Sequence, residues 1–301
     1  MKMHALSGSS LTVSALSMGT ANFGSKISEE QAFAHMDRYM ELGGNLLDTA
    51  HVYSDRLPGE RSRSEKIIGR WLKSRRPDNM VICTKGGHFN LDTPQISRVT
   101  PADLKQDLIE SLDSLQIDCI DLYMLHRDNP ALPVDEIMDC LDDFVRNGHV
   151  RYLACSNWTA QRIAQANAYA KARGMSPFIV DELMWSMADI NPDGIPSDYV
   201  VMDENSLRLG QESDMSFMCY SSLAHGYFTR RYAGMPVSDQ LRRTYDNPHN
   251  EKVFAQLQSL PDRAAVTRES LQFFSRQSVT AIPIVSFSSM EQLEECMSAF
   301  V

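Results

Sequence analysis

The stretch VICTKGGHFNLDTPQISRVTPADLKQDLIESLDSLQIDCIDLYMLH, residues 81–126, decides the fold. It begins with an apolar run, Val81 to Lys85, and ends with another, Ile120 to His126, each as long as a β-strand. Between them, Thr100-Pro101-Ala102-Asp103 supplies an N-cap, a first-turn proline and an acidic first turn for a helix. This strand–helix–strand unit is typical of a parallel sheet.

The same alternation of short apolar runs and helical stretches continues along the chain. Several runs are apolar on both faces, as strands enclosed between a barrel interior and outer helices must be. No segment has the composition of a domain linker, so we predict one α/β domain, residues 1–301, folded as a single (β/α)8 TIM barrel. The eight predicted strands are Leu16–Gly19, Asn45–Asp48, Val81–Lys85, Ile120–His126, Tyr152–Ser156, Phe178–Glu182, Phe217–Tyr220 and Ala281–Val285.

Local signals predict where further helices and loops lie. Ser28-Glu29-Glu30-Gln31 and Ser62-Arg63-Ser64-Glu65 both have the pattern of a capping box at the start of a helix. Residues Ala188–Met202 and Leu223–His249 are long and without clear periodicity. Because such segments in a compact domain usually cover a binding site, we expect them to be loops at the carboxyl-terminal rim of the barrel.

Composition excludes several classes of protein. The 301 residues include 29 Lys and Arg against 39 Asp and Glu, a net charge of −10, which disfavours binding to nucleic acid or to an anionic membrane surface. No run approaches the roughly 20 apolar residues of a membrane span, and the first residues are polar. The six cysteines contain no CxxC pair. We therefore expect a cytoplasmic protein with buried free thiols, a monomer or a weak oligomer.

Polar side chains follow several of the predicted strands. Asp48, Lys85 and His126 each end an apolar run, Ser156-Asn157 ends another, and Tyr53 lies five positions after Asp48. In a parallel barrel these carboxyl ends meet at one rim, where barrel enzymes place their active sites. The sequence therefore predicts that residues far apart in the chain share one pocket.

Four of these side chains make chemical sense together. A tyrosine has a pKa near 10, so Tyr53 needs a neighbouring cation to exchange protons at neutral pH. Lys85 supplies that charge, Asp48 holds the lysine in place, and His126 donates a hydrogen bond to the oxygen that Tyr53 protonates. The implied reaction is the polarisation and protonation of a carbonyl group.

Each of these residues also has an ordinary structural explanation. A single Asp is often a cap or half of an ion pair, a single Lys is usually solvated, and a single His or Tyr often only packs. Four of them at consecutive barrel positions make coincidence improbable. A metal site built from Asp48, His51 and His126 lacks a further histidine or carboxylate at ligand spacing, so no metal is predicted.

The stretch Gly43–Tyr53, GGNLLDTAHVY, resembles the signature of the aldo-keto reductase family around its catalytic Asp and Tyr. Several linked motifs in the family's order make the resemblance specific, and it covers nearly the whole chain. The other matching segments are Ser64-Glu65, Ser111–Leu115, Ile120–His126, Gly148–Tyr152, Ser156–Trp158, Tyr220–Ala224 and Phe228-Thr229.

The resemblance implies an NAD(P)-dependent oxidoreductase that moves a hydride between the cofactor and an aldehyde or ketone. Asp48, Tyr53, Lys85 and His126 match the family's catalytic tetrad, with Tyr53 as the general acid in reduction. The family binds NADP or NAD along the barrel rim, without the Gly-rich dinucleotide fingerprint that is also missing here. By the resemblance, the cofactor-binding residues are Thr20, Asp48, Ser156, Asn157, Glu182, Tyr220, Leu223, Arg231, Ser286, Ser288, Gln292 and Glu295.

Three positions depart from the family's pattern. Glu182 stands where the family usually has a Gln, and Cys296 replaces the customary Asn. Ser288 stands near the position at which NADPH-selective members have a basic residue, so a 2′-phosphate would lack its arginine partner there. The sequence therefore leaves open whether NAD or NADP is preferred.

The sequence is compatible with two functions. The first is carbonyl reduction, or the reverse alcohol oxidation, on a small molecule that carries hydroxyl groups, such as a sugar-derived carbonyl. The second is a regulatory barrel that binds the cofactor as a sensor, with little turnover, as some members of the family do. The substrate wall is expected to include Phe23, His88, Arg127 and Trp185.

Overall fold

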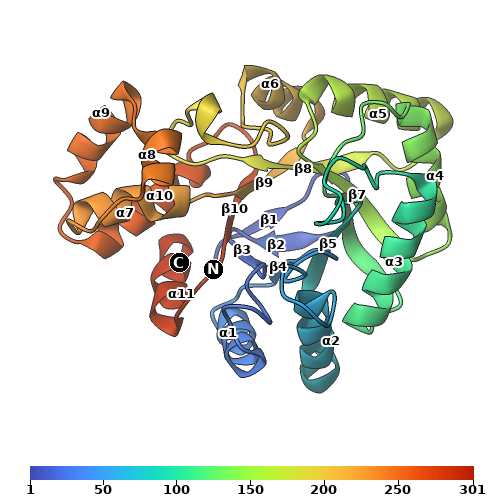
Figure 1. The fold of residues 1–301 in the computed structure, drawn as a ribbon, viewed down its shortest axis with the longest axis horizontal. Helices are drawn as coiled ribbons and strands as arrows, with labels where there is room; N and C mark the ends of the chain where they lie inside the picture. The colour runs from blue at the N-terminus through green and yellow to red at the C-terminus, as the bar shows by residue number, and fades with distance from the viewer.

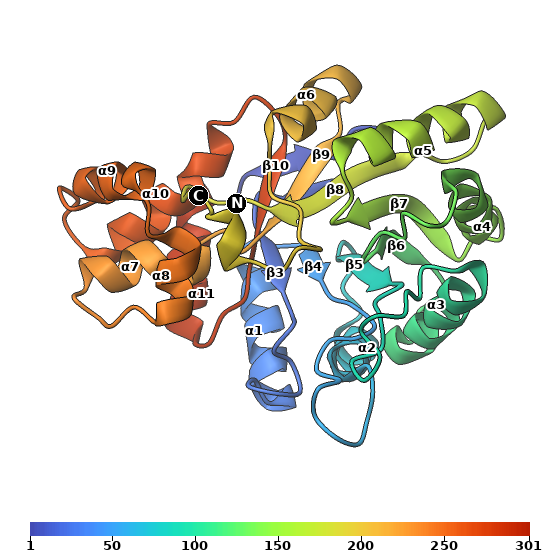
Figure 2. The same ribbon diagram turned by 45° about the horizontal axis from the view of Figure 1, so that its top comes forward.

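The computed structural model describes residues 1–301, and its centre is a closed barrel of parallel strands (Figures 1 and 2). Each strand pairs with the next one along the chain, and the last pairs with the first. The predicted eight-stranded (β/α)8 barrel is thus confirmed. The strands are β3 (Ser17–Gly19), β4 (Leu46–Asp48), β5 (Val81–Gly86), β6 (Ile120–Leu125), β7 (Val150–Ser156), β8 (Phe178–Met184), β9 (Ser216–Tyr220) and β10 (Ala281–Val285).

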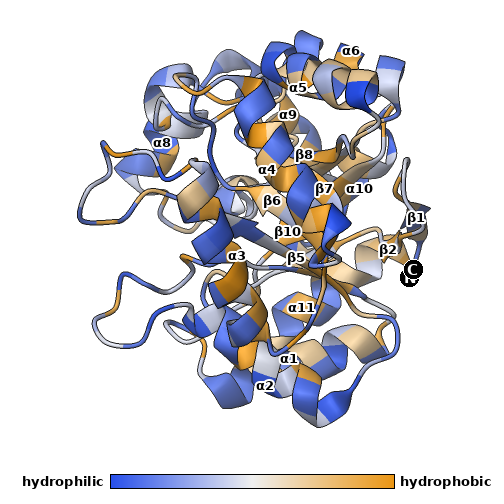
Figure 3. Ribbon diagram, turned by 90° about the vertical axis from the view of Figure 1, so that its right-hand side faces the viewer, coloured by the Kyte–Doolittle hydropathy of each residue, from blue (hydrophilic) through white to orange (hydrophobic).

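Helices surround the barrel, and their apolar faces pack on the outside of the strands (Figure 3). In the helix Val134–Arg146, for example, Ile137, Met138, Leu141 and Phe144 are buried at helical spacing. None of the helices combines the length and the apolar character needed to cross a bilayer. The surrounding helices are α1 (Glu29–Glu41), α2 (Arg63–Arg75), α3 (Pro101–Leu115), α4 (Val134–Arg146), α5 (Ala160–Arg173), α6 (Glu204–Ser213), α10 (Arg263–Ser275) and α11 (Met290–Met297).

Two of the three predicted helix starts are confirmed. Ser28 forms a full capping box with Gln31 at α1, and the Thr100 side chain caps α3. The prediction of a capping box at Ser62 is wrong, because this residue has a left-handed backbone with φ of 53° and makes no side-chain cap. Glu65, its expected partner, turns inward and accepts a hydrogen bond of 2.5 Å from Thr84 Oγ1.

A short antiparallel hairpin that the sequence analysis missed closes the amino-terminal end of the barrel. Its strands are β1 (Met3–Ala5) and β2 (Thr12–Ser14). Leu6, Leu11 and Val13 of this hairpin pack against the apolar side chains inside the barrel. Because three-residue strands carry too little periodicity, the pattern Leu6…Leu11-Thr12-Val13 around Gly8 was the only available signal.

The two long segments at the rim differ from each other. Ala188–Met202 contains only the short helix η1 (Pro192–Gly194), as a loop would. The prediction for Leu223–His249 is wrong, because that segment includes η2 (Ala224–Gly226) and most of a group of three short helices that project from one side of the barrel (Figure 1). These are α7 (Tyr227–Tyr232), α8 (Asp239–Tyr245) and α9 (Pro248–Leu257), which share an apolar cluster.

Asp181 is a carboxyl group in the interior without a charged partner. It lies in β8 and is fully buried, and its Oδ2 atom has no hydrogen-bond partner. Burial raises the pKa of Asp181 well above its ordinary value. Because the pKa is higher in the folded state, the stability that this residue contributes is present below about pH 4 and is lost as the pH rises towards the folded-state pKa.

We therefore expect the replacement Asp181→Asn to become more favourable, relative to the wild type, as the pH rises. The difference in free energy of unfolding should grow by up to about 1.4 kcal/mol per pH unit until the folded-state pKa is passed. Urea unfolding of both proteins at about pH 5 and about pH 7.5 measures it. An equal difference at both pH values would show that Asp181 has an ordinary pKa.

Candidate active site

Polar side chains form a layer above the apolar interior of the barrel. In a strand, residues i and i+2 face the same side. On six neighbouring strands an apolar residue of the inner cluster is followed two positions later by a predicted site residue, which therefore also faces inward. These pairs are Leu46 and Asp48, Cys83 and Lys85, Met124 and His126, Ala154 and Ser156, Val180 and Glu182, and Met218 and Tyr220.

The structure brings the four predicted catalytic residues together. Lys85 Nζ donates a short hydrogen bond to Asp48 Oδ1 and another, of 3.1 Å, to the carbonyl oxygen of Thr49. The same ammonium lies 3.3 Å from Tyr53 Oη. His126 presents its ring to Tyr53 edge to face, with 5.8 Å between ring centroids. The Lys85 ammonium thus contacts both the carboxyl group of Asp48, which holds it, and the phenol of Tyr53, which it can activate.

Opposing effects decide the charge of Lys85. Its side chain is fully buried, and burial disfavours the ammonium form. The carboxylates of Asp48 and Glu182 more than offset this, so the pKa of Lys85 lies well above its ordinary value. Lys85 is therefore a permanent cation at physiological pH.

Tyr53 and His126 are both held in their neutral forms. Burial raises the pKa of Tyr53 above its ordinary value, against the opposing effect of Lys85. Burial, with smaller effects from His88 and Arg127, lowers the pKa of His126 well below its ordinary value. The pocket thus presents a protonated phenol next to an uncharged imidazole, and the imidazole Nδ1 has no partner within the protein.

A hydrogen-bonded chain continues the polar layer across the next strands. Tyr220 Oη donates to Asn157 Oδ1 at 2.7 Å, and Asn157 Nδ2 donates to Ser156 Oγ at 3.0 Å. Ser156 Oγ in turn donates to Glu182 Oε1 at 3.3 Å. Thr20 is buried beside this layer and donates to the carbonyl oxygen of Asp48 at 2.9 Å, so it positions the end of β4.

A groove of about 680 Å³ runs from the catalytic residues to α11. Its lining includes Asp48 and Tyr53 at one end. It also includes four basic or polar residues that the sequence analysis did not name, because nothing in their local sequence marks them: Lys26, Arg230, Arg263 and Thr267. Its other lining residues include six of the predicted cofactor contacts, which are Tyr220, Leu223, Ser286, Ser288, Gln292 and Glu295.

The structure does not bring Arg231 to this groove. Arg231 pairs with Glu251 at 2.8 Å and lies over the ring of Phe254, 4.1 Å from its centroid. Arg230, its neighbour in the chain, lines the groove instead. In a six-residue helix the packing of one face decides which of two adjacent arginines points inward, and no periodicity reveals this.

The predicted substrate residues divide into two pairs. His88 packs edge to face against His126, with 4.7 Å between ring centroids, and Arg127 Nη1 donates to the carbonyl oxygen of His126 at 2.8 Å. None of the four residues lines the groove itself, but Phe23 and Trp185 also lie away from His126. Phe23 is buried in the main core, and Trp185 packs edge to face on the aromatic rings Phe217, Phe273 and Phe274.

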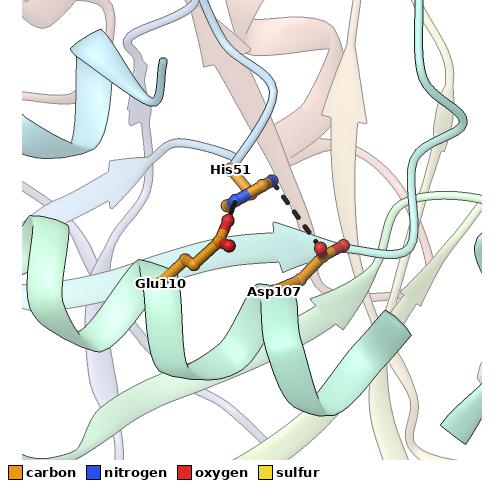
Figure 4. Close-up of side chains that lie close together, drawn as sticks. All are labelled: His51, Asp107 and Glu110. Atoms are coloured by element: carbon orange, nitrogen blue, oxygen red, sulfur yellow. Dashed lines mark hydrogen bonds and ion pairs between the residues drawn. The ribbon is translucent and has the colours of Figure 1, made fainter. Parts of the chain in front are cut away.

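His51, two positions before Tyr53, does not line the groove and instead lies against α3. Its Nε2 atom is 2.7 Å from Glu110 Oε2, and its Nδ1 atom is 3.9 Å from Asp107 Oδ1 (Figure 4). These three residues offer atoms that a metal could bind. However, Asp107 already accepts hydrogen bonds from Arg98 and from the Gly87 N–H group. The arrangement therefore clamps the Tyr53 loop to α3.

The groove fits a dinucleotide in shape and in charge. One wall is the loop after β9, where Ser221, Ala224, His225 and Gly226 all have positive φ. Ser221, His225 and Gly226 line the groove, whereas the N–H groups of Ala224 and Gly226 donate to the carbonyl oxygens of Ser221 and Leu223 within the loop. The basic side chains in the lining, Lys26, Arg230 and Arg263, offset the net charge of −10 locally.

Comparison with known proteins identifies the family. The sequence model of the Aldo/keto reductase family matches residues 15–301. Norsolorinic acid reductase B of Dothistroma septosporum is 27% identical, over 96% of this chain and 75% of that protein. Aryl-alcohol dehydrogenase (NADP(+)) of Phanerodontia chrysosporium is 32% identical, over 63% of this chain and 53% of that protein.

A solved structure agrees with this assignment. The aldo-keto reductase AKR11C1 from Bacillus halodurans, in its holo form, is 26% identical with a TM-score of 0.75, over 99% of this chain and 90% of that one. The chain belongs to the Aldo/keto reductase family. It is an oxidoreductase that uses NADP or NAD, and the expectation from the sequence is confirmed at that level.

We expect Lys85→Met to destabilise the fold strongly, because Asp48 and Glu182 would remain buried without a cation. The free energy of unfolding at neutral pH should fall by about 3–5 kcal/mol, and by less in acid, where Asp48 as well as Glu182 is protonated. The matched control is Lys66→Met, at an exposed pair with Glu60, which should cost at most about 1 kcal/mol. Equal losses in urea unfolding would contradict the assignment.

Proposed function

We propose that this enzyme reduces an aldehyde or ketone to an alcohol, with Tyr53 as the proton donor, and that it catalyses the reverse oxidation by the same groups. The observation that carries this proposal is the position of Lys85 Nζ, bonded to Asp48 and 3.3 Å from Tyr53 Oη. This buried arrangement lies at the end of a groove that fits a dinucleotide.

The residues that would hold the cofactor line the groove or, as Ser156 and Asn157 do, lie buried behind Tyr220 at its catalytic end. The polar chain of Ser156, Asn157 and Tyr220 suits the nicotinamide, and the loop after β9 with Arg230 suits the pyrophosphate. Ser286, Ser288, Gln292 and Glu295 line the far end, which suits the adenosine. When bound, the reduced nicotinamide supplies a hydride to the carbonyl carbon.

The protein supplies the proton and stabilises the charge that develops. Tyr53 Oη donates its proton to the carbonyl oxygen, and Lys85 stabilises the phenolate that remains. Neutral His126 is placed to donate a hydrogen bond to the same oxygen. In the reverse direction the phenolate accepts the proton of the alcohol.

The walls beside His126 support a substrate with an aromatic or hydroxylated body. Arg127 lies over the rings of Phe89 and Tyr199, 5.9 and 5.3 Å from their centroids, and His88 completes this surface. Aromatic faces and a guanidinium suit a flat, oxygen-rich carbonyl compound. A relative named as an aryl-alcohol dehydrogenase supports the same class of substrate.

Replacement of Tyr53 tests the proton donor. Because general acid catalysis contributes about 10²- to 10⁴-fold, Tyr53→Phe should lower kcat/KM by that factor while NADPH binding is retained. The decrease in NADPH absorbance with a panel of aryl and sugar-derived aldehydes measures the rate. Tyr232→Phe, whose hydroxyl donates to Leu260 in the α7–α9 cluster, is the matched control. If Tyr53→Phe turned over as fast as the wild type, Tyr53 would not be the proton donor. If the wild-type protein bound the cofactor but reduced none of the aldehydes, the sensor function would be favoured.

We also propose that the enzyme accepts NADPH, with Arg263 as the cation for the 2′-phosphate. Arg263 lines the adenosine end of the groove with Ser288 and Gln292, and pairs with Glu295 at 3.1 Å. Ser288 itself brings no charge, so the basic group comes from α10. The relative named with NADP(+) supports this choice.

Arg263→Ala should lower kcat/KM for NADPH by roughly tenfold or more, because a hydrogen bond to a charged phosphate is lost, and should leave that for NADH nearly unchanged. The control is Arg268→Ala, which is exposed on the same helix and does not line the groove. Steady-state kinetics with both cofactors measures the ratio. Equal losses with NADH and NADPH would exclude a role in reading the 2′-phosphate.

A further inference from the structure

Lys85 has a third acidic neighbour besides Asp48 and Tyr53. Glu182 reaches it from β8, and its Oε2 atom lies 3.3 Å from Lys85 Nζ, as far as Tyr53 Oη does. The Glu182 side chain is 4% exposed. Its Oε2 atom has no hydrogen bond, and its Oε1 atom accepts only from Ser156. Glu182 and Tyr53 therefore compete for the same ammonium.

The charges around Lys85 do not balance. Two buried carboxyl groups, Asp48 and Glu182, face one buried cation, and two carboxylates that share a site do not both ionise readily. Burial, with the charge of Asp48, raises the pKa of Glu182 to about 8 against the effect of Lys85. When Glu182 does ionise, its negative charge adds to the effects that raise the pKa of Tyr53.

We propose that Glu182 is a positioning residue for the proton of Tyr53. Its carboxylate interacts with Lys85 and so reduces the stabilisation that Lys85 gives to the Tyr53 phenolate. Tyr53 therefore stays a phenol in alkaline solution, which favours carbonyl reduction over alcohol oxidation. This inference rests on the proposed role of Tyr53 as the proton donor. It adds a group that acts through Lys85 and need not touch the substrate.

Of the other ionisable groups that face this cluster, only Asp48 also raises the pKa of Tyr53 by its charge, and Asp48 is present in every variant compared below. Lys85 stays charged, and His126 stays neutral because its pKa is well below the ordinary value. Asp181, next to Glu182 in β8, faces the other side of the sheet. Burial raises the pKa of each remaining neighbour, and these are Asp48 from β4, Cys83 from β5, and Cys219 and Tyr220 from β9.

The test without cofactor or substrate is a titration of Tyr53 itself. Protein labelled with ¹³Cζ-tyrosine is titrated by NMR from about pH 7 to pH 11, and the spectrum of Tyr53→Phe identifies the Tyr53 signal. We expect the phenolate of Tyr53 to form at a pH lower by roughly one unit or more in Glu182→Gln than in the wild type. If Glu182→Gln does not fold, Glu182→Met removes the same charge with a similar volume.

Asp181→Asn is the matched control, because it removes a buried carboxyl group from the same strand without facing Lys85. It should leave the Tyr53 signal as in the wild type. An unchanged Tyr53 titration in the Glu182 variants, or a Tyr53 signal that stays that of a phenol up to pH 11 in all proteins, overturns the proposal. So does an equal shift in Asp181→Asn.

Turnover supplies a second, independent result. In Glu182→Gln the alkaline limit of carbonyl reduction should move to lower pH by roughly one unit, and alcohol oxidation at about pH 8 should become several-fold faster relative to reduction. Pure loss of folding or of cofactor binding would lower both directions together and would count against the proposal. The NMR titration uses protein without ligands, so a failure of the proposed reaction remains distinguishable from a failure of this inference.

Discussion

The buried ammonium of Lys85 is the constraint on which the site depends. A lysine without any exposed surface needs acidic partners within reach, and Asp48 and Glu182 supply them from two different strands. Once the cation is held, the phenol of Tyr53 has a neighbour that can stabilise its conjugate base. The chemistry of the pocket thus follows from the charge balance around one atom.

The barrel makes this cluster possible because it stacks a polar layer on an apolar one. Within the barrel, side chains such as Leu46, Cys83 and Met124 fill the interior, and the next inward-facing residues form the site. The apolar layer excludes water from below, which strengthens every electrostatic interaction above it. The hairpin β1–β2 completes this seal at the amino-terminal end.

The sequence predicted the tetrad but not the whole groove, for physical reasons. Asp48, Lys85 and His126 were predictable because each ends an apolar run, and all such ends meet at one rim of a parallel barrel. Arg263 and Arg230 were not, because they lie on helices whose rotation depends on packing. Phe23 and Trp185 were expected in the substrate wall, but Phe23 is buried in the core and Trp185 packs in an aromatic cluster.

By itself the sequence determined the eight-unit barrel, the four residues at its rim and the family, because strand length, polarity and motif spacing are local properties of the chain. Only the tertiary structure decided that Glu182 shares Lys85 with Tyr53, that Arg263 lines the far end of the groove, and that Asp181 is buried without a charged partner. These features depend on strand register and helix packing, which bring residues together across the barrel at distances that no local pattern encodes.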